Sequence, residues 1–312
     1  MVRFDATAQQ MSYRNRRATL LINPAARGAR NFDVVGALAR LREGGLTPRL
    51  VVSRDSVHAT GIAHQAVDDG DDLVFVVGGD GSARVIAGAL AGSNTALATL
   101  RAGTANVWAH EMGIPSGLKG IDAHLSGQVV SVDLCYRDDE PFLLMAGIGW
   151  DAEIAGRVRE STKRLLGPGA YVLEAARAMP GLRPAEMHYT IDGVERTTNA
   201  AQVVLGNTRL YGSVAHLTPW AIATDGQMDV MIVSPGSVGA GLAAVARLAI
   251  PKLGDGSSIW RGRATRFTIE TPGLPVQLDG DPSGETPAAF RVAPGVLKVS
   301  VPAGPLPAVL GG

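Results

Sequence analysis

The chain has 312 residues, enough for roughly two domains, and 46% of them are hydrophobic, so full cores can form. Its 29 basic and 29 acidic residues cancel, so no global positive field favours nucleic acid as a partner. A single cysteine, Cys135, excludes an internal disulfide framework and fits a reducing compartment. Because its neighbours have a strand pattern, we expect a packed structural thiol there rather than a nucleophile.

Residues 1–17 are polar and contain no apolar core of signal-peptide length, so we expect them to form a loose tail. The longest apolar stretch outside the expected strands is Val238–Ile250, which is too short to span a bilayer and is interrupted by Arg247. The sequence therefore predicts a cytoplasmic protein with no transmembrane segment. Its only expected membrane association is peripheral, at the inner membrane surface.

The first half of the chain alternates strand and helix patterns, which predicts an α/β domain with a doubly wound parallel sheet. The expected strands are Ala18–Ile22, Leu50–Ser53, Leu73–Val77 and Thr95–Leu100. The expected helices are Asn31–Arg42, His58–Asp68, Ala83–Ala91 and one from Asn106 to about Met112.

From about Gln128 the pattern changes to consecutive strands, which predicts an antiparallel β-sandwich. The expected strands are Val129–Tyr136, Phe142–Ala146, Met187–Ile191, Val194–Asn199, Gln202–Leu205, Met228–Val233, Arg266–Glu270, Val276–Leu278, Ala289–Val292 and Leu297–Val301. Asp192-Gly193 is a strong two-residue hairpin signal, and two helical inserts are expected at about Ala152–Met179 and Val238–Ile250.

These patterns divide the chain into an α/β domain at residues 1–130 and a β-sandwich domain at 131–294. The C-terminal segment 295–312 is a candidate addition to the first domain. Its Pro/Gly-rich end, Pro302–Gly312, is expected to fray.

The run Gly78-Gly79-Asp80-Gly81-Ser82 follows a short, buried apolar strand and precedes a helix. Glycines at a strand end let backbone amides approach a phosphate, and the helix N-terminus attracts the anion. The carboxylate of Asp80 repels bare phosphate but fits a bridging divalent cation. The segment therefore predicts a nucleotide-phosphate site with magnesium, although an ordinary strand-to-helix turn has the same local pattern.

Other turns carry groups of the same kind. Gly103 and Thr104 follow the next expected strand and can add an amide and a hydroxyl to the same phosphates. Asp225, Asp279 and Asp281 lie on expected turns of the second domain, where turn formation alone is an alternative explanation for each. We also expect a tight glycine turn at Ala146–Ala152.

Taken together in order, these motifs resemble the bacterial diacylglycerol-kinase-like lipid kinases, a family that includes sphingosine and ceramide kinases. The resemblance runs from about Thr19 to Val301. The matching signatures are Asn23-Pro24, Gly78–Ser82, Gly103–Asn106, Gly147–Ala152, Leu166-Gly167 with Ala170-Tyr171, Asn207 with Tyr211-Gly212, Pro219 with Asp225-Gly226 and Asp229-Val230, and Asp279–Pro282.

The resemblance implies an active site in the cleft between the domains, where the γ-phosphate of ATP passes to a lipid hydroxyl. It implies ATP and Mg²⁺ as cofactors, a lipid substrate at a membrane surface as the partner, and leaves a homodimer open. It assigns Asp281 as the general base and Asp80 as a second catalytic residue. It also assigns Asp225, with the main-chain oxygens of Ile222 and Gln227, as a structural magnesium site. The implied ATP-binding residues are Asn23, Ser53, Gly78, Gly79, Asp80, Gly81, Ser82, Gly103, Thr104 and Asn106.

The chain departs from the family at two points. The glycine loop continues as Ala83-Arg84-Val85 where the family has an Asn and a Glu, and Ser213-Val214 replaces expected glycines. One alternative is therefore a nucleotide- or lipid-binding relative with weakened catalysis. A second alternative is an NAD-kinase-like enzyme, which shares the Gly-Gly-Asp-Gly loop.

Several residues have a simpler structural explanation. We expect Trp108, Trp150 and Trp220 to be core residues rather than lipid contacts, and Asp151 to cap a helix. The six histidines lack zinc-type spacing and are expected in the core or on the surface.

Overall fold

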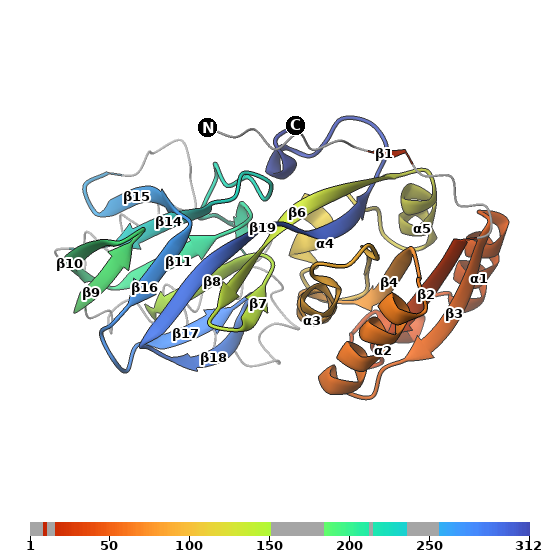
Figure 1. Ribbon diagram of the computed structural model, residues 1–312, viewed down its shortest axis with the longest axis horizontal. Coiled ribbons are helices and arrows are strands. Elements are labelled where there is room, and N and C mark those ends of the chain that lie inside the picture. The colour runs from red at the N-terminus through yellow and green to blue at the C-terminus, as the bar shows by residue number, and fades with distance from the viewer. Residues whose placement is uncertain (1–8, 11–15, 151–183, 212–214, 236–255) are drawn as a thin grey trace. The chain divides into compact units, whose positions relative to one another are not determined.

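A computed structural model describes residues 9–10, 16–150, 184–211, 215–235 and 256–312 of the chain. The chain forms two compact units (Figure 1). Unit 1 consists of Met1–Leu134, Ala223–Asp225 and Ala293–Gly312, and unit 2 consists of Cys135–Ile222 and Gly226–Val292. The expected helices at Ala152–Met179 and Val238–Ile250, the cap at Asp151 and the signature Leu166–Tyr171 lie outside the described residues.

Unit 1 is built on a parallel sheet in the strand order β5-β4-β2-β3. These strands are β2 (Arg16–Ile22), β3 (Leu46–Val52), β4 (Leu73–Gly78) and β5 (Ala96–Arg101). The end of β19 (Ala288–Val301) joins the sheet parallel to β5, and β1 (Gln9–Gln10) pairs with β6 (Gln128–Arg137). Every residue of β4 is buried, as its continuous apolar run predicts.

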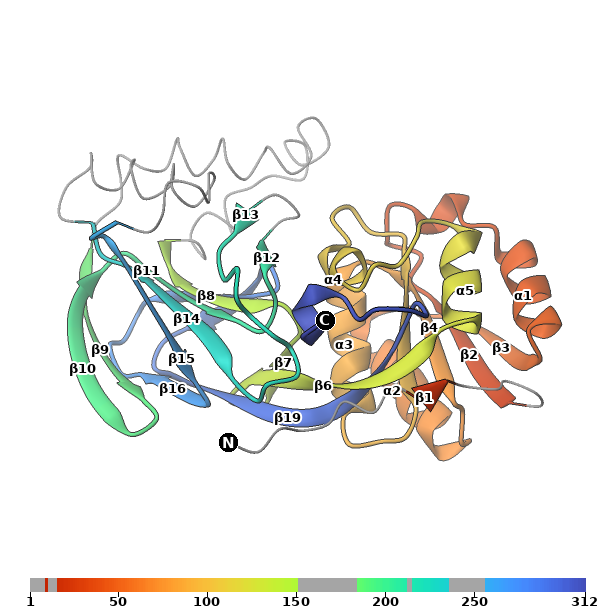
Figure 2. The same cartoon turned by 90° about the horizontal axis from the view of Figure 1, so that it is seen from above.

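Helices cover both faces of this sheet (Figure 2). They are α1 (Val34–Glu43), α2 (Ser56–Asp68), α3 (Asp80–Leu90), α4 (Val107–Glu111) and α5 (Leu118–Leu125), with short 3-10 turns η1 (Ala29–Asn31) and η4 (Ala308–Leu310). Helix α1 packs beside α5 and α2 beside α3. The carboxylates of Asp33 and Asp55 cap α1 and α2, accepting hydrogen bonds from the backbone N–H of Gly36 and His58.

Unit 2 is antiparallel. One six-stranded sheet has the order β15-β14-β11-β8-β17-β18, and β10, β9, β16 and the start of β19 pair in a second layer. The strands are β7 (Glu140–Phe142), β8 (Met145–Gly149), β9 (Ala185–Ile191), β10 (Val194–Ala200), β11 (Gln202–Gly206), β12 (Leu210–Tyr211), β13 (Ala215–His216), β14 (Met228–Val233), β15 (Ile259–Ala264), β16 (Arg266–Ile269), β17 (Pro275–Leu278) and β18 (Asp281–Glu285). Residues from both layers, including Cys135, share one core, so the packed thiol is confirmed.

Two local expectations hold in detail. Asp192 and Gly193 have φ of 47° and 84° and close the β9-β10 hairpin with Ile191 opposite Val194, as a two-residue turn requires. Trp108 and His124 are fully buried, as expected for core residues.

Three expectations about the backbone were wrong, and one helix was not expected. The supposed glycine turn at Ala146–Ala152 is strand β8 as far as Gly149, because Gly147 pairs with both β11 and β17 and Gly149 pairs with β11. Ala288–Val301 is one strand rather than two. Helix α5 had no distinct sequence signal. The C-terminal end does not fray: Val309 and Leu310 are buried, and the Val309 carbonyl accepts a hydrogen bond from Ala223.

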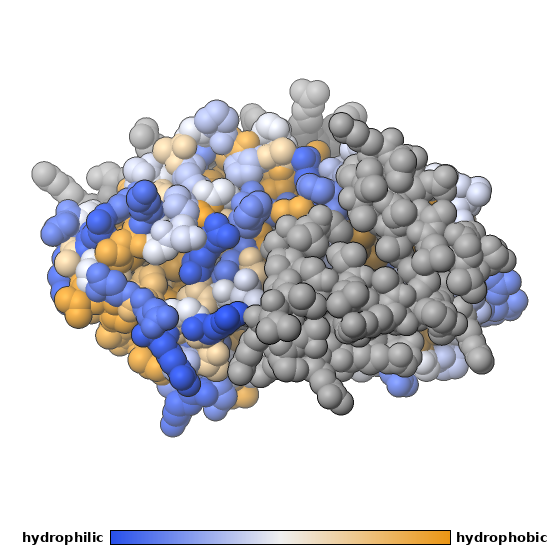
Figure 3. Space-filling view, turned by 180° about the vertical axis from the view of Figure 1, so that it is seen from behind, coloured by the Kyte–Doolittle hydropathy of each residue, from blue (hydrophilic) through white to orange (hydrophobic). Residues whose placement is uncertain are grey.

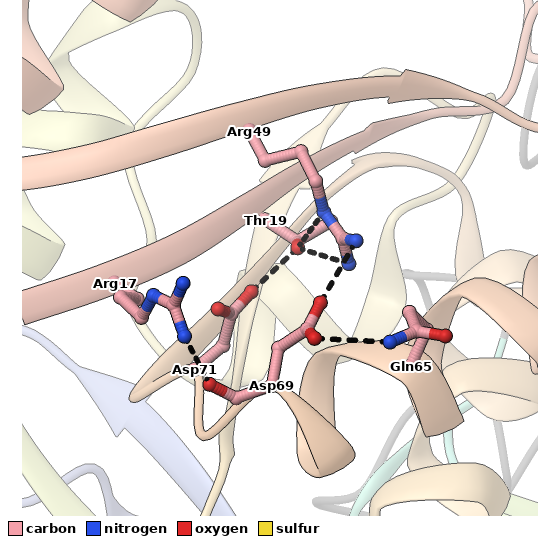
Figure 4. Close-up of polar contacts among 6 residues, drawn as sticks. All are labelled: Arg17, Thr19, Arg49, Gln65, Asp69 and Asp71. Atoms are coloured by element: carbon pink, nitrogen blue, oxygen red, sulfur yellow. Dashed lines mark hydrogen bonds and ion pairs between the residues drawn. The ribbon is translucent and has the colours of Figure 1, made fainter.

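The start of β2 is tied to the sheet by a polar network that extends from Arg17 to Gln65 (Figure 4). The Thr19 hydroxyl donates to the Asp71 carboxylate at 2.5 Å, and Arg49 donates to both Thr19 and Asp69. Burial raises the pKa of Asp71, opposed by the Thr19 hydrogen bond. The network joins β2, β3 and the turn before β4 at the end of the sheet away from the glycine loops.

Exposed apolar side chains of unit 1 are Val35, Leu50, Val52 and Val57. Figure 3 shows apolar residues interspersed with polar ones over the described part of the face that it presents. Among the described residues, the model contains no helix that is long and apolar enough to cross a membrane.

His124 of helix α5 forms hydrogen bonds to strands β5 and β19 of unit 1. Its Nε2 lies 3.0 Å from the Thr99 carbonyl, which can only accept, so Nε2 carries the proton. Its Nδ1 then accepts from the Ser300 hydroxyl at 2.9 Å, and its ring packs edge-on against Phe75. Complete burial lowers the pKa of His124 to about 4, opposed by the hydrogen bond to Thr99.

We predict that acid weakens unit 1 through His124. Between pH 6.5 and about 4 the unfolded chain binds a proton on this imidazole and the folded chain does not, so stability falls as the pH falls. The full loss from this group is about 3 kcal/mol. Urea unfolding of unchanged protein and of His124→Gln, from pH 7 to 4, measures the difference. The exposed His64→Gln is the control, and an equal pH dependence in all three proteins contradicts the prediction.

Candidate nucleotide-binding site

The predicted site residues of unit 1 gather at the carboxyl ends of the parallel strands. β2 is the first of the four parallel strands along the chain. Since β3 lies on one side of it and β4 on the other, the strand order reverses between β2 and β4. Open α/β sheets bind ligands at such a switch point. Asn23 follows β2 and Gly78–Ser82 follow β4, which puts both motifs at the reversal.

Hydrogen bonds join the loops that follow β2, β4 and β5. The Asn23 side chain donates to the Ser82 hydroxyl at 2.8 Å, which links the first loop to helix α3. The Ala102 amide donates to the Gly78 carbonyl, and the Ala102 carbonyl accepts from Gly28 at 2.7 Å. The expectation that Gly103-Thr104 neighbours the glycine loop is therefore confirmed.

The two glycine loops touch at Gly79 and Gly103. A Cβ added to Gly103 would lie 2.4 Å from the Gly79 Cα, and a Cβ added to Gly79 would lie 3.2 Å from the Gly103 Cα. Both neighbouring atoms are backbone and cannot rotate away. The glycines are thus required for the close approach of the two loops.

Asn106 organises the second loop rather than facing outward. It has φ 51°, and its side chain accepts from the Gly103 amide at 2.7 Å and donates to the Gly103 carbonyl at 2.8 Å. In this structure the Gly103 N–H donates to the Asn106 side chain and so stabilises the loop. Thr104 lies in the same loop and is exposed.

Asp80 caps helix α4, whose N-cap residue Asn106 makes no side-chain capping hydrogen bond. Its two carboxylate oxygens accept from the backbone N–H groups of Val107 and Trp108, each at 3.0 Å. These are first-turn amides of α4, which have no partner inside the helix. Burial raises the pKa of Asp80, and the hydrogen bonds from Trp108 and Val107 oppose that shift. Sequence reasoning missed this role because the partners lie 27 and 28 residues away.

The remaining groups at this edge suit an anion. Helix α3 begins at Asp80 after an extended Gly79, so its first-turn amides lie at the loop. Ser82 lies in that first turn. Ser53 is buried, and its amide and hydroxyl both donate to the Ile22 carbonyl, so it joins the ends of β2 and β3.

In unit 2, Asp279-Gly280 forms the tight turn between β17 and β18. The two residues have φ of 53° and 90°, and Leu278 pairs with Asp281 across the turn. Asp281 is therefore the first residue of β18 rather than a turn residue, and it is exposed.

Asp279 holds a neighbouring loop. Its carboxylate accepts from the amides of Leu143 and Leu144 at 2.8 Å and of Met145 at 3.0 Å. The Gly280 amide in turn donates to the Gln277 side chain at 2.6 Å. The position of Asp281 is consequently set by a turn that is anchored on both sides.

The predicted metal ligands Ile222, Asp225 and Gln227 lie in the irregular segment before β14. A carboxylate and two carbonyl oxygens are hard donors of the kind that magnesium prefers, so the residue types fit. No group of three or more His, Cys, Asp or Glu side chains with metal-binding geometry occurs among the described residues.

Comparison with known proteins identifies related chains along nearly the whole length. Residues 17–136 match the diacylglycerol kinase catalytic domain, and residues 145–301 match the YegS C-terminal NAD kinase beta sandwich-like domain. A "Probable lipid kinase YegS-like" of Pseudomonas putida is 30% identical, over 93% of this chain and 96% of its own. A "Diacylglycerol kinase" of Mycobacterium tuberculosis is 29% identical, over 92% and 95%.

Two solved structures from Bacillus anthracis str. Sterne have the same fold. Their TM-scores are 0.76 and 0.70 at 23% and 19% identity, and each comparison covers 94% of this chain and 98% of the other. The second is described as a diacylglycerol kinase.

We predict that Gly103→Ala separates the two glycine loops. The new methyl group overlaps the Gly79 backbone, so stability falls by about 1–3 kcal/mol and ATP affinity falls with it. Thermal unfolding and calorimetric titration with ATP measure both. Gly61→Ala is the control, because a Cβ there meets nothing within 4 Å in helix α2. Unchanged ATP affinity in Gly103→Ala would contradict the prediction.

We also predict that Asp80→Asn destabilises the protein in the absence of nucleotide and metal. The asparagine amide cannot accept the second backbone N–H, so one first-turn donor of α4 loses its partner, at a cost of about 1–3 kcal/mol. Urea unfolding measures this, with the exposed Asp68→Asn as control. If Asp80→Asn is as stable as the unchanged protein and differs only with magnesium present, its role is ligand binding alone.

Proposed function

The chain belongs to the diacylglycerol-kinase-like family of lipid kinases, and from that premise we propose that it transfers the γ-phosphate of ATP to a lipid hydroxyl. The observation that carries the proposal is the pair of glycine loops that follow β4 and β5 and meet beside the switch point of the parallel sheet. Phosphoryl transfer depends on positioning and charge neutralisation, which such loops and a helix N-terminus provide.

In this proposal the residues of unit 1 hold ATP. The first turn of α3, with Gly81 and Ser82, binds phosphate oxygens through amides and a hydroxyl. Thr104 adds a hydroxyl from the second loop, while Gly79 and Gly103 let the two loops close together. Asn23, Ser53 and Asn106 keep these loops in place through their hydrogen bonds. Asp80 contributes by fixing α4 against the glycine loop.

Asp281 is proposed to act as the general base. An alcohol becomes a competent nucleophile when a carboxylate takes its proton. The lipid oxygen then bonds to the γ-phosphorus, the bond to the β-phosphate oxygen breaks, ADP leaves and the proton remains on Asp281. Mg²⁺, when bound, supplies neutralisation of phosphate charge, and a structural ion at Asp225, Ile222 and Gln227 is part of the proposal.

The acceptor is proposed to be a lipid with a free hydroxyl, such as diacylglycerol or a sphingoid base, presented at a membrane surface. This assigns the protein to phospholipid metabolism on the cytoplasmic side of the inner membrane.

The alternative of a relative with weakened catalysis rests on Arg84-Val85 in the first turns of α3. Activity that appears only after Arg84→Asn with Val85→Glu would favour it.

We predict that Asp281→Asn lowers kcat by a factor of about 10²–10⁴, the usual contribution of a general base, while ATP affinity is unchanged. Transfer of labelled phosphate from ATP to a panel of lipids in mixed micelles measures kcat, and calorimetry measures ATP binding. Glu285→Gln is the matched control, because it removes another exposed carboxylate from the same strand.

Two outcomes would overturn the assignment. Full activity in Asp281→Asn removes this residue as the base. Failure of the unchanged protein to phosphorylate any lipid while it binds ATP removes the lipid kinase assignment, and phosphate incorporation into NAD instead would establish the NAD-kinase-like alternative.

A further inference from the structure

The strand that carries Asp281 is intrinsically weak. β18 is the terminal strand of the six-stranded sheet, where it pairs with β17 (Figure 1). The register of that pairing is irregular between Pro275 and Gln277. The sequence of β18, Asp-Pro-Ser-Gly-Glu, contains none of the β-branched or aromatic residues that favour strands, and it includes both proline and glycine, which disfavour them. The position of Asp281 therefore depends strongly on contacts made outside the strand ladder.

One short segment, residues 137–145, supplies such contacts on both sides of Asp281. The carboxylate of Asp279, two residues before Asp281, accepts hydrogen bonds from the three backbone amides that directly follow β7. The hydroxyl of Ser283, two residues after Asp281, accepts from Nη1 of Arg137 at 2.8 Å. Asp281 thus lies midway between two anchors that come from the same segment.

The second anchor is a network of charged and polar groups around Ser283. This hydroxyl is buried, and it donates to the Glu140 carboxylate at 2.5 Å while it accepts from Arg137. Nη2 of Arg137 donates to the Glu285 carbonyl at 2.8 Å, so the planar guanidinium holds two points of β18 at once, which an ammonium group cannot do in the same way. Gly284 has φ 70°, and a Cβ there would lie 3.3 Å from Nη1 of Arg137, so the glycine leaves room for the guanidinium.

The hairpin that carries Arg137 is itself held in place. Arg137 pairs with Glu140 across the turn between β6 and β7. At that turn the Asp138 amide donates to the Ala289 carbonyl at 2.7 Å, and the Asp138 carboxylate accepts from the Ala289 amide at 3.3 Å. Ala289 belongs to the long strand β19. The network therefore connects the weak strand β18 to a strand in the interior of unit 2.

We propose that Arg137, together with Ser283 and Glu140, positions Asp281 for proton transfer. The inference rests on the proposed function, in which Asp281 takes the proton of the lipid hydroxyl. Residues two apart on a strand project to the same face, so the contact at Ser283 fixes the face of β18 from which Asp281 projects. A general base must lie within hydrogen-bond reach of its proton, and a displacement of about 1 Å can lower the rate by about 10²-fold.

Stabilisation of unit 2 alone is the competing explanation, because hydrogen-bonded charged networks can also contribute only to folding. The arrangement favours positioning. Both anchors act on the few residues around Asp281, and the groups that they hold are on the terminal strand rather than in the core. The two explanations differ in whether the effect of Arg137 on the rate depends on the Asp281 carboxylate.

The first experiment measures kcat, KM and thermal unfolding of full-length variants, with labelled ATP and a lipid panel in mixed micelles. We expect Arg137→Gln and Ser283→Ala to lower kcat by about tenfold or more, with an unchanged KM for ATP. Ser283→Thr keeps the hydroxyl and should retain activity. Arg291→Gln is the matched control, because the Arg291 guanidinium lies 4.3 Å from the ring centroid of Tyr136, the residue next to Arg137.

A double-mutant cycle separates positioning from folding. If Arg137 acts through Asp281, then Arg137→Gln causes no further loss of kcat in the Asp281→Asn background. Hydrogen exchange of the peptide that spans residues 279–285 gives a readout without catalysis, and it should become faster in Arg137→Gln but not in Arg291→Gln. Full kcat in Arg137→Gln overturns the proposal, and so does an equal loss of kcat in both backgrounds.

The unchanged protein decides the proposed function separately. If it phosphorylates a lipid and Arg137→Gln does so equally fast, the proposed function stands and the positioning role is wrong. If it phosphorylates no lipid, the proposed function is wrong and the catalytic part of this inference falls with it. In that case the exchange of residues 279–285 still decides whether Arg137 anchors β18.

Discussion

The close approach of Gly79 to Gly103 is the constraint on which the candidate nucleotide site of unit 1 depends. The loops after β4 and β5 can lie backbone against backbone only because neither carries a Cβ at the contact. Once they are in contact, Asp80 at the start of α3 reaches the first-turn amides of α4. Loop packing, helix capping and the position of the α3 N-terminus are thus parts of one arrangement.

Burial of the charged Asp80 carboxylate has a free-energy cost. Burial raises the pKa of Asp80, because the protonated form is favoured more in the folded protein than in water. The two backbone donors offset part of that cost. A serine or asparagine at position 80 would avoid the burial of a charge but could not bridge two amides 27 residues away in the chain. The aspartate in the glycine loop, which the sequence analysis interpreted through a bridging cation, thus also has a structural role as the cap of α4.

The sequence was informative where the signal is local. The buried strand β4, the parallel sheet implied by alternating elements and the Asp192-Gly193 hairpin follow from short-range periodicity and turn chemistry. It was uninformative where partners are distant in the chain. His124 meets Ser300 across 176 residues, and Asp279 meets Leu143 across 136. The expectation that Trp220 lies in the core was also wrong: the side chain is exposed, and the guanidinium of Arg261, 41 residues further along the chain on β15, lies over its ring.

The glycine turn expected around Gly147 failed for an instructive reason. Glycine indicates a turn only when the backbone leaves the sheet, and here Gly147 pairs with Val204 on one side and Gln277 on the other. Small residues in a central strand let something else approach closely, and Gly206 on the neighbouring strand β11 shows this, because a Cβ there would lie 2.2 Å from the Thr218 hydroxyl oxygen. The Thr218 hydroxyl in turn donates to the Thr208 carbonyl, so the segment that leads to Trp220 begins against this glycine. In unit 2, as in unit 1, a missing side chain therefore decides where a neighbouring segment can lie.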